Sequence, residues 1–212
     1  MHLQSREREK GILIGDTLIH YDTSPVSLAV ESTRLMLAEV QESEKILLER
    51  RKLEYMAIRR IKNHYFPQQR ILYLPNGKPI LEGSSLTLGI SHSQNHALFA
   101  YSEVLFGCDI EEKNERLFTI KDRFVHPLEL SNFSLFSNLD QLCILWSCKE
   151  AIYKLFGMRG INWKEQCILF KEAFPQLTFR LLLENHETLI HCHVKEFNEN
   201  TWMAFAVNAT HG

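Results

Sequence analysis

The sequence predicts an α+β protein built from two halves, each combining short strands with one long helix. Two long helical stretches, 41–66 and 139–156, lie far apart in the chain. Short strand-like runs precede each of them, and further runs after residue 166 predict an antiparallel meander. With 212 residues and 45% hydrophobic side chains, the chain has enough apolar material for one large domain or two small ones.

The composition is that of a globular protein and argues against several other classes. The net charge of −2 provides no basic excess for binding nucleic acid. No apolar run approaches the roughly 18 residues of a membrane-spanning helix, and the charged start of the chain does not resemble a signal peptide. Five scattered cysteines without a Cys-x-x-Cys pair argue against a disulfide framework. We therefore expect a soluble cytoplasmic protein without membrane or nucleic-acid partners.

The first half begins with strands and continues into a long helix. Residues 11–21 alternate loosely between apolar and polar, which predicts one or two short strands. The stretch 28–37 predicts a short helix. Residues 41–66 predict a long helix that ends before Pro67, because proline cannot continue a helix.

The long helix carries an expected ion pair and a basic face. Arg50 and Glu54 lie four residues apart and are therefore neighbours on the helix surface. The basic side chains form either a solvated face or an anion site for a polyphosphate ligand; they are Arg51, Lys52, Arg59, Arg60 and Lys62.

Short strands and turns follow the helix. Residues 71–73 and 86–90 predict strands, and Asn76-Gly77-Lys78-Pro79 between them predicts a turn, because Asn-Gly tolerates positive φ. The runs 97–101 and 104–110 predict a hairpin whose second strand leads into an acidic segment.

Two acids in that segment point the same way. Side chains of a strand alternate, so Asp109 and Glu111 lie on one face while Glu112 lies on the other. Two adjacent carboxylates repel each other unless a cation lies between them. Together with Glu150 they supply three hard oxygen ligands, which suits Mg²⁺. A magnesium site with few protein ligands normally shares its metal with substrate phosphates.

The apolar run 142–156 predicts a buried helix with one narrow polar stripe. Ser147, Glu150 and Lys154 form the stripe, and the last two are neighbours four residues apart. A buried acid and base are costly unless they pair or hold a ligand, so a structural ion pair is the alternative to a functional site. Lys149 falls on the apolar side of this helix and has no partner that the sequence identifies.

The last third of the chain predicts two more helices and a meander. Residues 115–124 predict one helix, and a second begins at His126. His191-Cys192-His193 has a metal-like composition, but no second ligand pair is nearby, which argues against zinc. Four strands are expected over 167–170, 177–184, 188–194 and 202–208.

Two motifs resemble a known family. Gly107-Cys108-Asp109-Ile110-Glu111 and Trp146-Ser147-Cys148-Lys149-Glu150-Ala151-Ile152-Tyr153-Lys154 resemble the paired signature of the 4′-phosphopantetheinyl transferases. Ile90-Ser91-His92-Ser93 and Asn76-Gly77-Lys78-Pro79 resemble elements of the larger, Sfp-type branch. That branch has two pseudo-symmetric α+β halves with coenzyme A in the cleft between them. We therefore divide the chain into halves 1–95 and 96–212. Because one chain supplies both halves, we expect a monomer.

The resemblance implies binding roles for several residues. It places Mg²⁺ on Asp109, Glu111 and Glu150. It places coenzyme A against Lys154 and against four residues of the first half, which are Arg59, Lys78, Ser91 and His92. Lys78 would lie beside the 3′-phosphate, and Arg59 at the nucleotide end.

The resemblance also implies a reaction, which is transfer of 4′-phosphopantetheine from coenzyme A to a serine of an apo acyl or peptidyl carrier protein, releasing 3′,5′-ADP. Lys154 would stabilise or protonate the leaving phosphate. The general base is open between Glu150, Glu129 and a metal-bound water. The segment from Arg123-Phe124 to Glu129 resembles a family segment whose glutamate lies near the metal and the incoming hydroxyl, which makes Glu129 an auxiliary candidate. The alternative is a structural acid at the start of a helix, where the helix dipole favours it.

Other functions remain open from the residues themselves. The alternatives are a non-catalytic relative that binds coenzyme A or a carrier protein, a Mg²⁺-dependent phosphohydrolase, and a polar stripe that is only structural. The carrier itself, from fatty acid, polyketide or nonribosomal peptide synthesis, is not indicated by any residue pattern.

Overall fold

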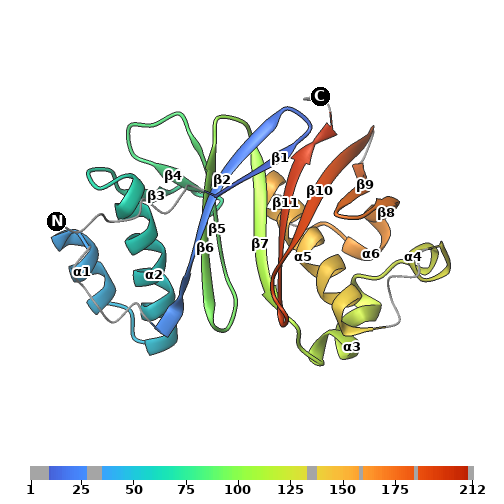
Figure 1. Cartoon of the computed structure of the whole chain (residues 1–212), viewed down its shortest axis with the longest axis horizontal. Helices are drawn as coiled ribbons and strands as arrows, with labels where there is room; N and C mark the ends of the chain where they lie inside the picture. The colour runs from blue at the N-terminus through green and yellow to red at the C-terminus, as the bar shows by residue number, and fades with distance from the viewer. Residues whose placement is uncertain (1–9, 28–34, 133–137, 158–159, 184–185, 210–212) are drawn as a thin grey trace, which may run out of the picture.

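The computed structural model describes residues 10–27, 35–132, 138–157, 160–183 and 186–209 (Figure 1). It contains two antiparallel sheets, each covered by one long helix, which confirms the predicted α+β class and is consistent with the phosphopantetheinyl transferase fold. Within the described residues, no helix is both long and apolar enough to cross a membrane.

The first half of the chain forms a six-stranded sheet in the order β1-β2-β6-β5-β4-β3. Its elements are β1 (Lys10–Ile14), β2 (Thr17–Pro25), α1 (Leu37–Glu44), α2 (Glu49–Tyr65), β3 (Ile71–Tyr73), β4 (Pro79–Leu81), β5 (Thr87–His92) and β6 (His96–Ser102).

The second half forms a five-stranded sheet in the order β7-β11-β10-β9-β8. Its elements are β7 (Phe106–Glu112), α3 (Arg116–Ile120), a short 3-10 turn (Lys121–Arg123), α4 (Pro127–Asn132), α5 (Leu139–Phe156), α6 (Trp163–Gln166), β8 (Cys167–Ala173), β9 (Gln176–Leu183), β10 (His186–Asn198) and β11 (Thr201–Asn208). The expected meander is therefore present as β8 to β11.

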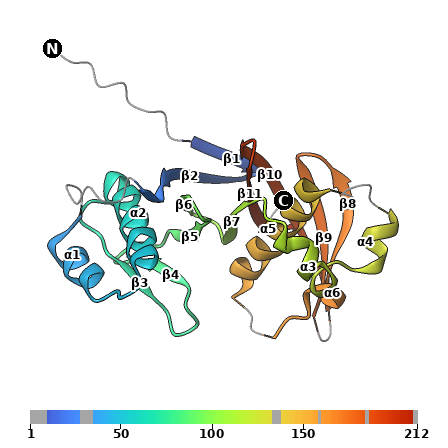
Figure 2. The same ribbon diagram turned by 90° about the horizontal axis from the view of Figure 1, so that it is seen from below.

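Three apolar clusters hold the layers together. One lies between α2 and the first sheet, and includes Ala57 and Phe99. A second lies between the two sheets and joins β1, β2 and β6 to β7 and β11. The third packs α5 on the second sheet, with Cys148 and Phe179 fully buried. Figures 1 and 2 show α1 and α2 on one outer side of the molecule and α3 to α6 on the other.

The helix predicted over 41–66 is wrong in its first part, because the chain forms two helices there. α1 ends at Glu44 and α2 begins at Glu49. α1 contacts α2 through Glu39, whose carboxylate lies 3.0 Å from the ammonium of buried Lys62, and through Glu42, which accepts a 2.6 Å hydrogen bond from the Tyr55 hydroxyl. These contacts between helices outweigh the local helical pattern. The short helix expected at 28–37 lies mostly outside the described residues.

The predicted hairpin of 97–101 and 104–110 is also wrong. β6 pairs with β2 and β5 in the first sheet, whereas β7 pairs with β11 in the second. The chain thus passes from one sheet to the other between Ser102 and Phe106. The division into units 1–95 and 96–212 stays a prediction about how the chain folds.

Helix α5 has the predicted bounds of 139–156. The Asn138 side chain accepts a hydrogen bond from the backbone N–H of Gln141 and so caps the first turn. Gly157 ends the helix with a φ of 63°, a left-handed conformation that glycine adopts without strain.

Candidate active site

A pocket of about 400 Å³ lies where the two halves meet. Clefts between structural units are favoured ligand sites. Its walls come from α2 and β5 of the first half and from β7 and α5 of the second. It is lined by Arg51, Ile90, Ser91, His92, Asp109, Glu111, Trp146, Glu150 and Lys154, which include six of the predicted site residues.

Gly107 allows α5 to pack directly on β7. A Cβ atom at this position would lie 2.0 Å from the carbonyl oxygen of Ala151 and 2.5 Å from the backbone nitrogen of Leu155. Both distances are far inside van der Waals contact, so any side chain would push the helix away from the strand. The glycine of the first motif therefore lets the acids of β7 and the polar stripe of α5 face one pocket.

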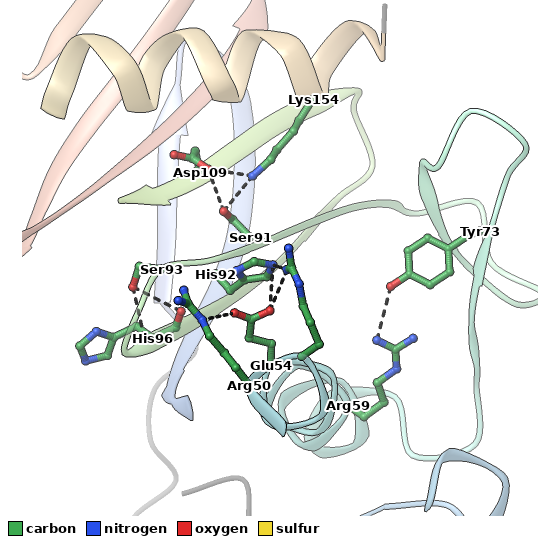
Figure 3. A network of polar contacts seen from close by, with 11 residues as sticks. Arg50, Glu54, Arg59, Tyr73, Ser91, His92, Ser93, His96, Asp109 and Lys154 are labelled. Atoms are coloured by element: carbon green, nitrogen blue, oxygen red, sulfur yellow. Dashed lines mark hydrogen bonds and ion pairs between the residues drawn. The ribbon is translucent and has the colours of Figure 1, made fainter. Parts of the chain in front are cut away.

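Asp109 is the hub of the contacts in this pocket. It is only 4% exposed, and its Oδ1 accepts hydrogen bonds from the Ser91 hydroxyl and the Lys154 ammonium, both at 2.7 Å. Its Oδ2 accepts from the Ser147 hydroxyl at 3.1 Å. Lys154 therefore pairs with Asp109 of the neighbouring strand (Figure 3), which corrects the structural pair of Lys154 with Glu150 considered from the sequence.

Lys154 keeps its positive charge in this setting. Burial acts to lower the pKa of its ammonium, but the charge of Asp109, the hydrogen bond to Asp109 and the charge of Glu150 act together against burial, and the pKa is raised above its ordinary value. The ammonium also lies 2.8 Å from the hydroxyl of Ser91. Ser91 thus holds Lys154 and Asp109 together from the facing strand β5.

The surroundings of Glu111 and Glu150 favour the neutral carboxyl groups, whereas those of Lys154 favour its charged form. Burial, the charge of Asp109 and the charge of Glu150 together raise the pKa of Glu111 to about 8. Burial and Asp109 likewise raise the pKa of Glu150. Within the described residues, neither carboxylate has a hydrogen bond or an ion pair. Two carboxyl groups that are costly to ionise therefore lie beside the aspartate that pairs with Lys154.

The three acids fit a divalent cation by their chemistry. They supply carboxylate oxygens, the ligands that Mg²⁺ prefers, and a bound cation would relieve their mutual repulsion. Within the described part of the chain, no three His, Cys, Asp or Glu side chains stand close enough together to hold a metal ion. Asp109 is engaged by Lys154 instead. Binding a cation would therefore require the carboxylates to turn toward it.

A second, smaller pocket of about 210 Å³ adjoins the first. Ile90 and Lys154 line both pockets, so the two lie side by side. Lys78 lines the smaller one from the turn between β3 and β4, where its backbone N–H donates to the Asn76 side chain. Burial lowers the pKa of Lys78. Tyr73 forms part of the same wall.

Arg59 lies behind that wall and lines neither pocket. It is 4% exposed, and its guanidinium stacks on the Tyr55 ring at 3.8 Å from the centroid. It donates a 3.4 Å hydrogen bond to the Tyr73 hydroxyl (Figure 3). Lys62 of the same helix is also fully buried, so the predicted basic face is not uniformly solvated.

Glu129 lies outside the pocket, in a buried ion pair with Lys149. The two side chains are 0% and 1% exposed, and Glu129 Oε2 lies 3.1 Å from Lys149 Nζ. Glu129 also accepts from the backbone N–H groups of His126 and Leu169, and Lys149 donates to the Phe124 carbonyl. This pair joins α4, α5 and β8. It supplies the partner for Lys149 that the sequence did not identify, and its position favours a structural role for Glu129.

Two site residues were not predicted as such. Arg51 was one of several basic residues on its helix, yet it alone of that set lines the pocket with the acids. Glu54 forms the expected pair with Arg50 at 3.0 Å, and in addition contacts Arg51 and His92. Helical spacing predicts the first contact, but nothing in the sequence indicates that β5 comes to the same carboxylate.

Residues 105–206 match the family model of the 4′-phosphopantetheinyl transferase superfamily. The matched region contains β7 and α5, which carry Asp109, Glu111, Glu150 and Lys154. The match indicates a transferase of the phosphopantetheinyl transferase type. A search of curated proteins found no match.

Proposed function

We propose that this protein transfers 4′-phosphopantetheine from coenzyme A to a serine of an apo acyl or peptidyl carrier protein, with release of 3′,5′-ADP. The observation that carries the proposal is the meeting of three carboxylates and a protonated lysine at one pocket between the halves. The superfamily match over 105–206 and the resemblance of the first half to the Sfp-type branch agree with it.

The transfer breaks a phosphoanhydride bond of coenzyme A and forms a phosphoester bond to the carrier serine. The carrier serine Oγ forms a bond to the phosphorus that carries pantetheine, and the bond from this phosphorus to the bridging oxygen of the pyrophosphate breaks. Glu150 lines the pocket one helical turn before Lys154 and accepts the serine proton. Lys154 stabilises the charge that develops on the leaving phosphate.

The two pockets divide the binding of coenzyme A. Lys78 binds the 3′-phosphate in the smaller pocket, and His92 binds the pyrophosphate in the larger one. Ser91 holds Lys154 and Asp109 in position. Arg59 acts indirectly, because it supports Tyr73 in the pocket wall.

Mg²⁺ would be held by Asp109, Glu111 and Glu150. When bound, it would neutralise the negative charge of the pyrophosphate. Asp109 would then contact both the cation and the Lys154 ammonium. We leave Glu129 out of the catalytic set because its carboxylate is occupied by Lys149 and by two backbone groups.

A groove beside the pocket suits the carrier protein. It has a volume of about 480 Å³ and shares Glu111 and Trp146 with the larger pocket. Arg116 and Arg123 line it together with apolar side chains. An acidic partner surface would complement this groove despite the net charge of −2 on the whole chain.

Intact-mass spectrometry of apo carrier proteins tests the proposal. After incubation with this protein, coenzyme A and Mg²⁺, we expect a mass gain equal to one phosphopantetheine, and none when EDTA is added. The Asp109→Ala variant should give no gain while remaining folded. If no carrier type gains mass although coenzyme A binds, the protein is a non-catalytic relative. Release of phosphate without a carrier would instead indicate a phosphohydrolase.

A further inference from the structure

Strands β5 and β7 belong to different sheets but lie side by side where the two halves meet. Three alternate residues of the first half face β7 along this contact. A Cβ atom on Gly89 would lie 2.6 Å from a side chain of β7. The Ser91 hydroxyl donates to Asp109 at 2.7 Å, and the Ser93 hydroxyl donates to Glu112 at 2.6 Å. Because these contacts advance together along both strands, β5 and β7 run in the same direction with a fixed register.

Glu112, the last residue of β7, holds the turn that follows β5. Its Oε1 accepts hydrogen bonds from the Ser93 hydroxyl at 2.6 Å and from the backbone N–H of Asn95 at 2.7 Å. Its Oε2 accepts from the side-chain amide of Asn95 at 2.9 Å, and Oε1 also lies 3.6 Å from Nδ1 of His96. The Glu112 side chain is only 12% exposed, so water competes little for these hydrogen bonds. One carboxylate of the second half therefore organises the β5–β6 turn of the first.

The covalent connection between the two sheets lies at the opposite end of these strands. The chain passes from β6 to β7 between Ser102 and Phe106, whereas Glu112 contacts the turn before β6. The apolar cluster between the sheets is not directional, but hydrogen bonds require defined distances and angles. At the end remote from the covalent connection, the hydrogen bonds of Glu112 therefore set how β5 lies against β7.

We propose that Glu112 is a positioning residue, which fixes Ser91 against Asp109 and Lys154 by fastening the turn after β5 to the end of β7. Ser91 lies two residues before Ser93, and its hydroxyl contacts both Asp109 and Lys154 in the pocket. Glu112 itself does not line that pocket, so it acts through Ser91. The consequence for catalysis rests on the proposed function, whereas the fastening of the two halves does not.

Two substitutions separate hydrogen bonding by Glu112 from its negative charge. In Glu112→Gln the side-chain oxygen still accepts from Ser93 and from the N–H of Asn95. The new NH₂ group donates to the Asn95 side-chain oxygen once that amide turns over. Fastening therefore predicts that Glu112→Gln behaves like the wild type and that Glu112→Ala does not. A charge that acts on the neighbouring acids predicts similar effects in both variants.

Hydrogen–deuterium exchange measured by mass spectrometry tests the fastening without any transfer reaction. In Glu112→Ala, exchange over residues 91–96 should become faster by about tenfold or more, the factor for loss of one charge-assisted hydrogen bond. In Glu112→Gln it should stay within about twofold of the wild type. Glu103→Ala is the matched control, because Glu103 is an exposed acid on the loop between β6 and β7. Wild-type exchange in Glu112→Ala would overturn the proposal.

Steady-state transfer assays measure the consequence for the reaction. In Glu112→Ala we expect kcat to fall by about tenfold, since a misplacement of about 1 Å can cost up to about a hundredfold. KM for coenzyme A should change less, because Lys78 binds the coenzyme in the smaller pocket, away from this turn. Glu112→Gln should restore kcat. Equal losses of kcat in both variants, wild-type kcat in Glu112→Ala, or a change in KM alone would overturn the positioning role.

A further variant covers the case in which Glu112→Ala does not fold, which thermal unfolding shows. Ser93→Ala/Asn95→Ala removes both side-chain donors and leaves the carboxylate in place. It should also speed exchange over 91–96 and lower kcat, and wild-type values of both would overturn the proposal. A wild type that transfers no phosphopantetheine contradicts the proposed function, and exchange in these variants still decides whether Glu112 fastens the two halves.

Discussion

Among single residues, Lys154 links the two halves of the molecule at the pocket. It contacts Asp109 of β7 and Ser91 of β5, and it lines both the larger and the smaller pocket. Its pKa is raised, so it stays charged at neutral pH. In the proposed transfer, a charge held in this way would be preorganised for the leaving phosphate, because the surrounding groups would need no rearrangement during the reaction.

Lys154→Ala should therefore lower turnover more than coenzyme affinity. We expect kcat to fall by about a hundredfold, the usual effect of removing one group that stabilises developing charge. Steady-state transfer assays and calorimetry with coenzyme A measure the two effects separately. Exposed Lys171 on β8 provides the control substitution, Lys171→Ala, which should change neither. A loss of affinity at unchanged kcat would make Lys154 a binding residue only.

Glu111 should make the metal-free protein sensitive to pH. Burial, followed by the charges of Asp109 and Glu150, raises its pKa from 4.5 to about 8 in the folded state. Between these values the folded state keeps a proton that the unfolded state releases, so stability falls as pH rises. We expect the unfolding midpoint in EDTA to decrease with pH across this window, and the decrease to be smaller in Glu111→Gln.

Added Mg²⁺ should counteract the loss of stability at higher pH. A cation and the proton compete for the same carboxylates, so the stabilisation by Mg²⁺ should grow as pH rises. Thermal unfolding with Mg²⁺ and with EDTA at matched pH values measures the difference. Equal pH dependence in the wild type and in Glu111→Gln would show that another group is responsible.

At the scale of elements, the pair of Lys149 with Glu129 fixes α5 to α4 and β8. Lys149→Met would leave a carboxylate buried without its counter-charge, which typically costs about 3–5 kcal/mol of stability. The Lys149→Met/Glu129→Gln double variant should recover part of this, because an amide is uncharged and its oxygen still accepts from Leu169 N–H. Denaturant unfolding of both variants measures the recovery.

The double variant also tests the function of Glu129. If Glu129 is structural, the folded double variant should transfer phosphopantetheine at about the wild-type rate. A folded but inactive double variant would return Glu129 to the catalytic candidates. The sequence could not distinguish these roles, because the helix-start position of Glu129 is compatible with both.

At the scale of the whole molecule, the two sheets share a buried cluster, and the chain changes sheet only after β6. Fragment 1–95 lacks β6, the strand that pairs with both β2 and β5. We therefore expect it to show no cooperative unfolding by circular dichroism. Fragment 1–102 keeps the complete sheet but exposes its face toward the second half, so it should bind a hydrophobic dye. Cooperative unfolding of fragment 1–95 would support the division at 95/96.

Much of the site could be predicted from the sequence, because local periodicity determines which side chains share a face. The alternation of a strand places Asp109 and Glu111 together, and the helical repeat places Glu150 and Lys154 on one stripe. Apolar runs with clear ends likewise determined α5 and the C-terminal meander. These features depend only on residues that are close in the chain.

The tertiary structure alone decided which partners these faces meet. Lys154 pairs with Asp109 rather than with Glu150, and Lys149 with Glu129, across 45 and 20 residues of sequence. The break between α1 and α2 and the contact of Arg51 with His92 are of the same kind. Contacts between distant segments depend on how sheets and helices pack, and periodicity within one segment contains no information about that packing.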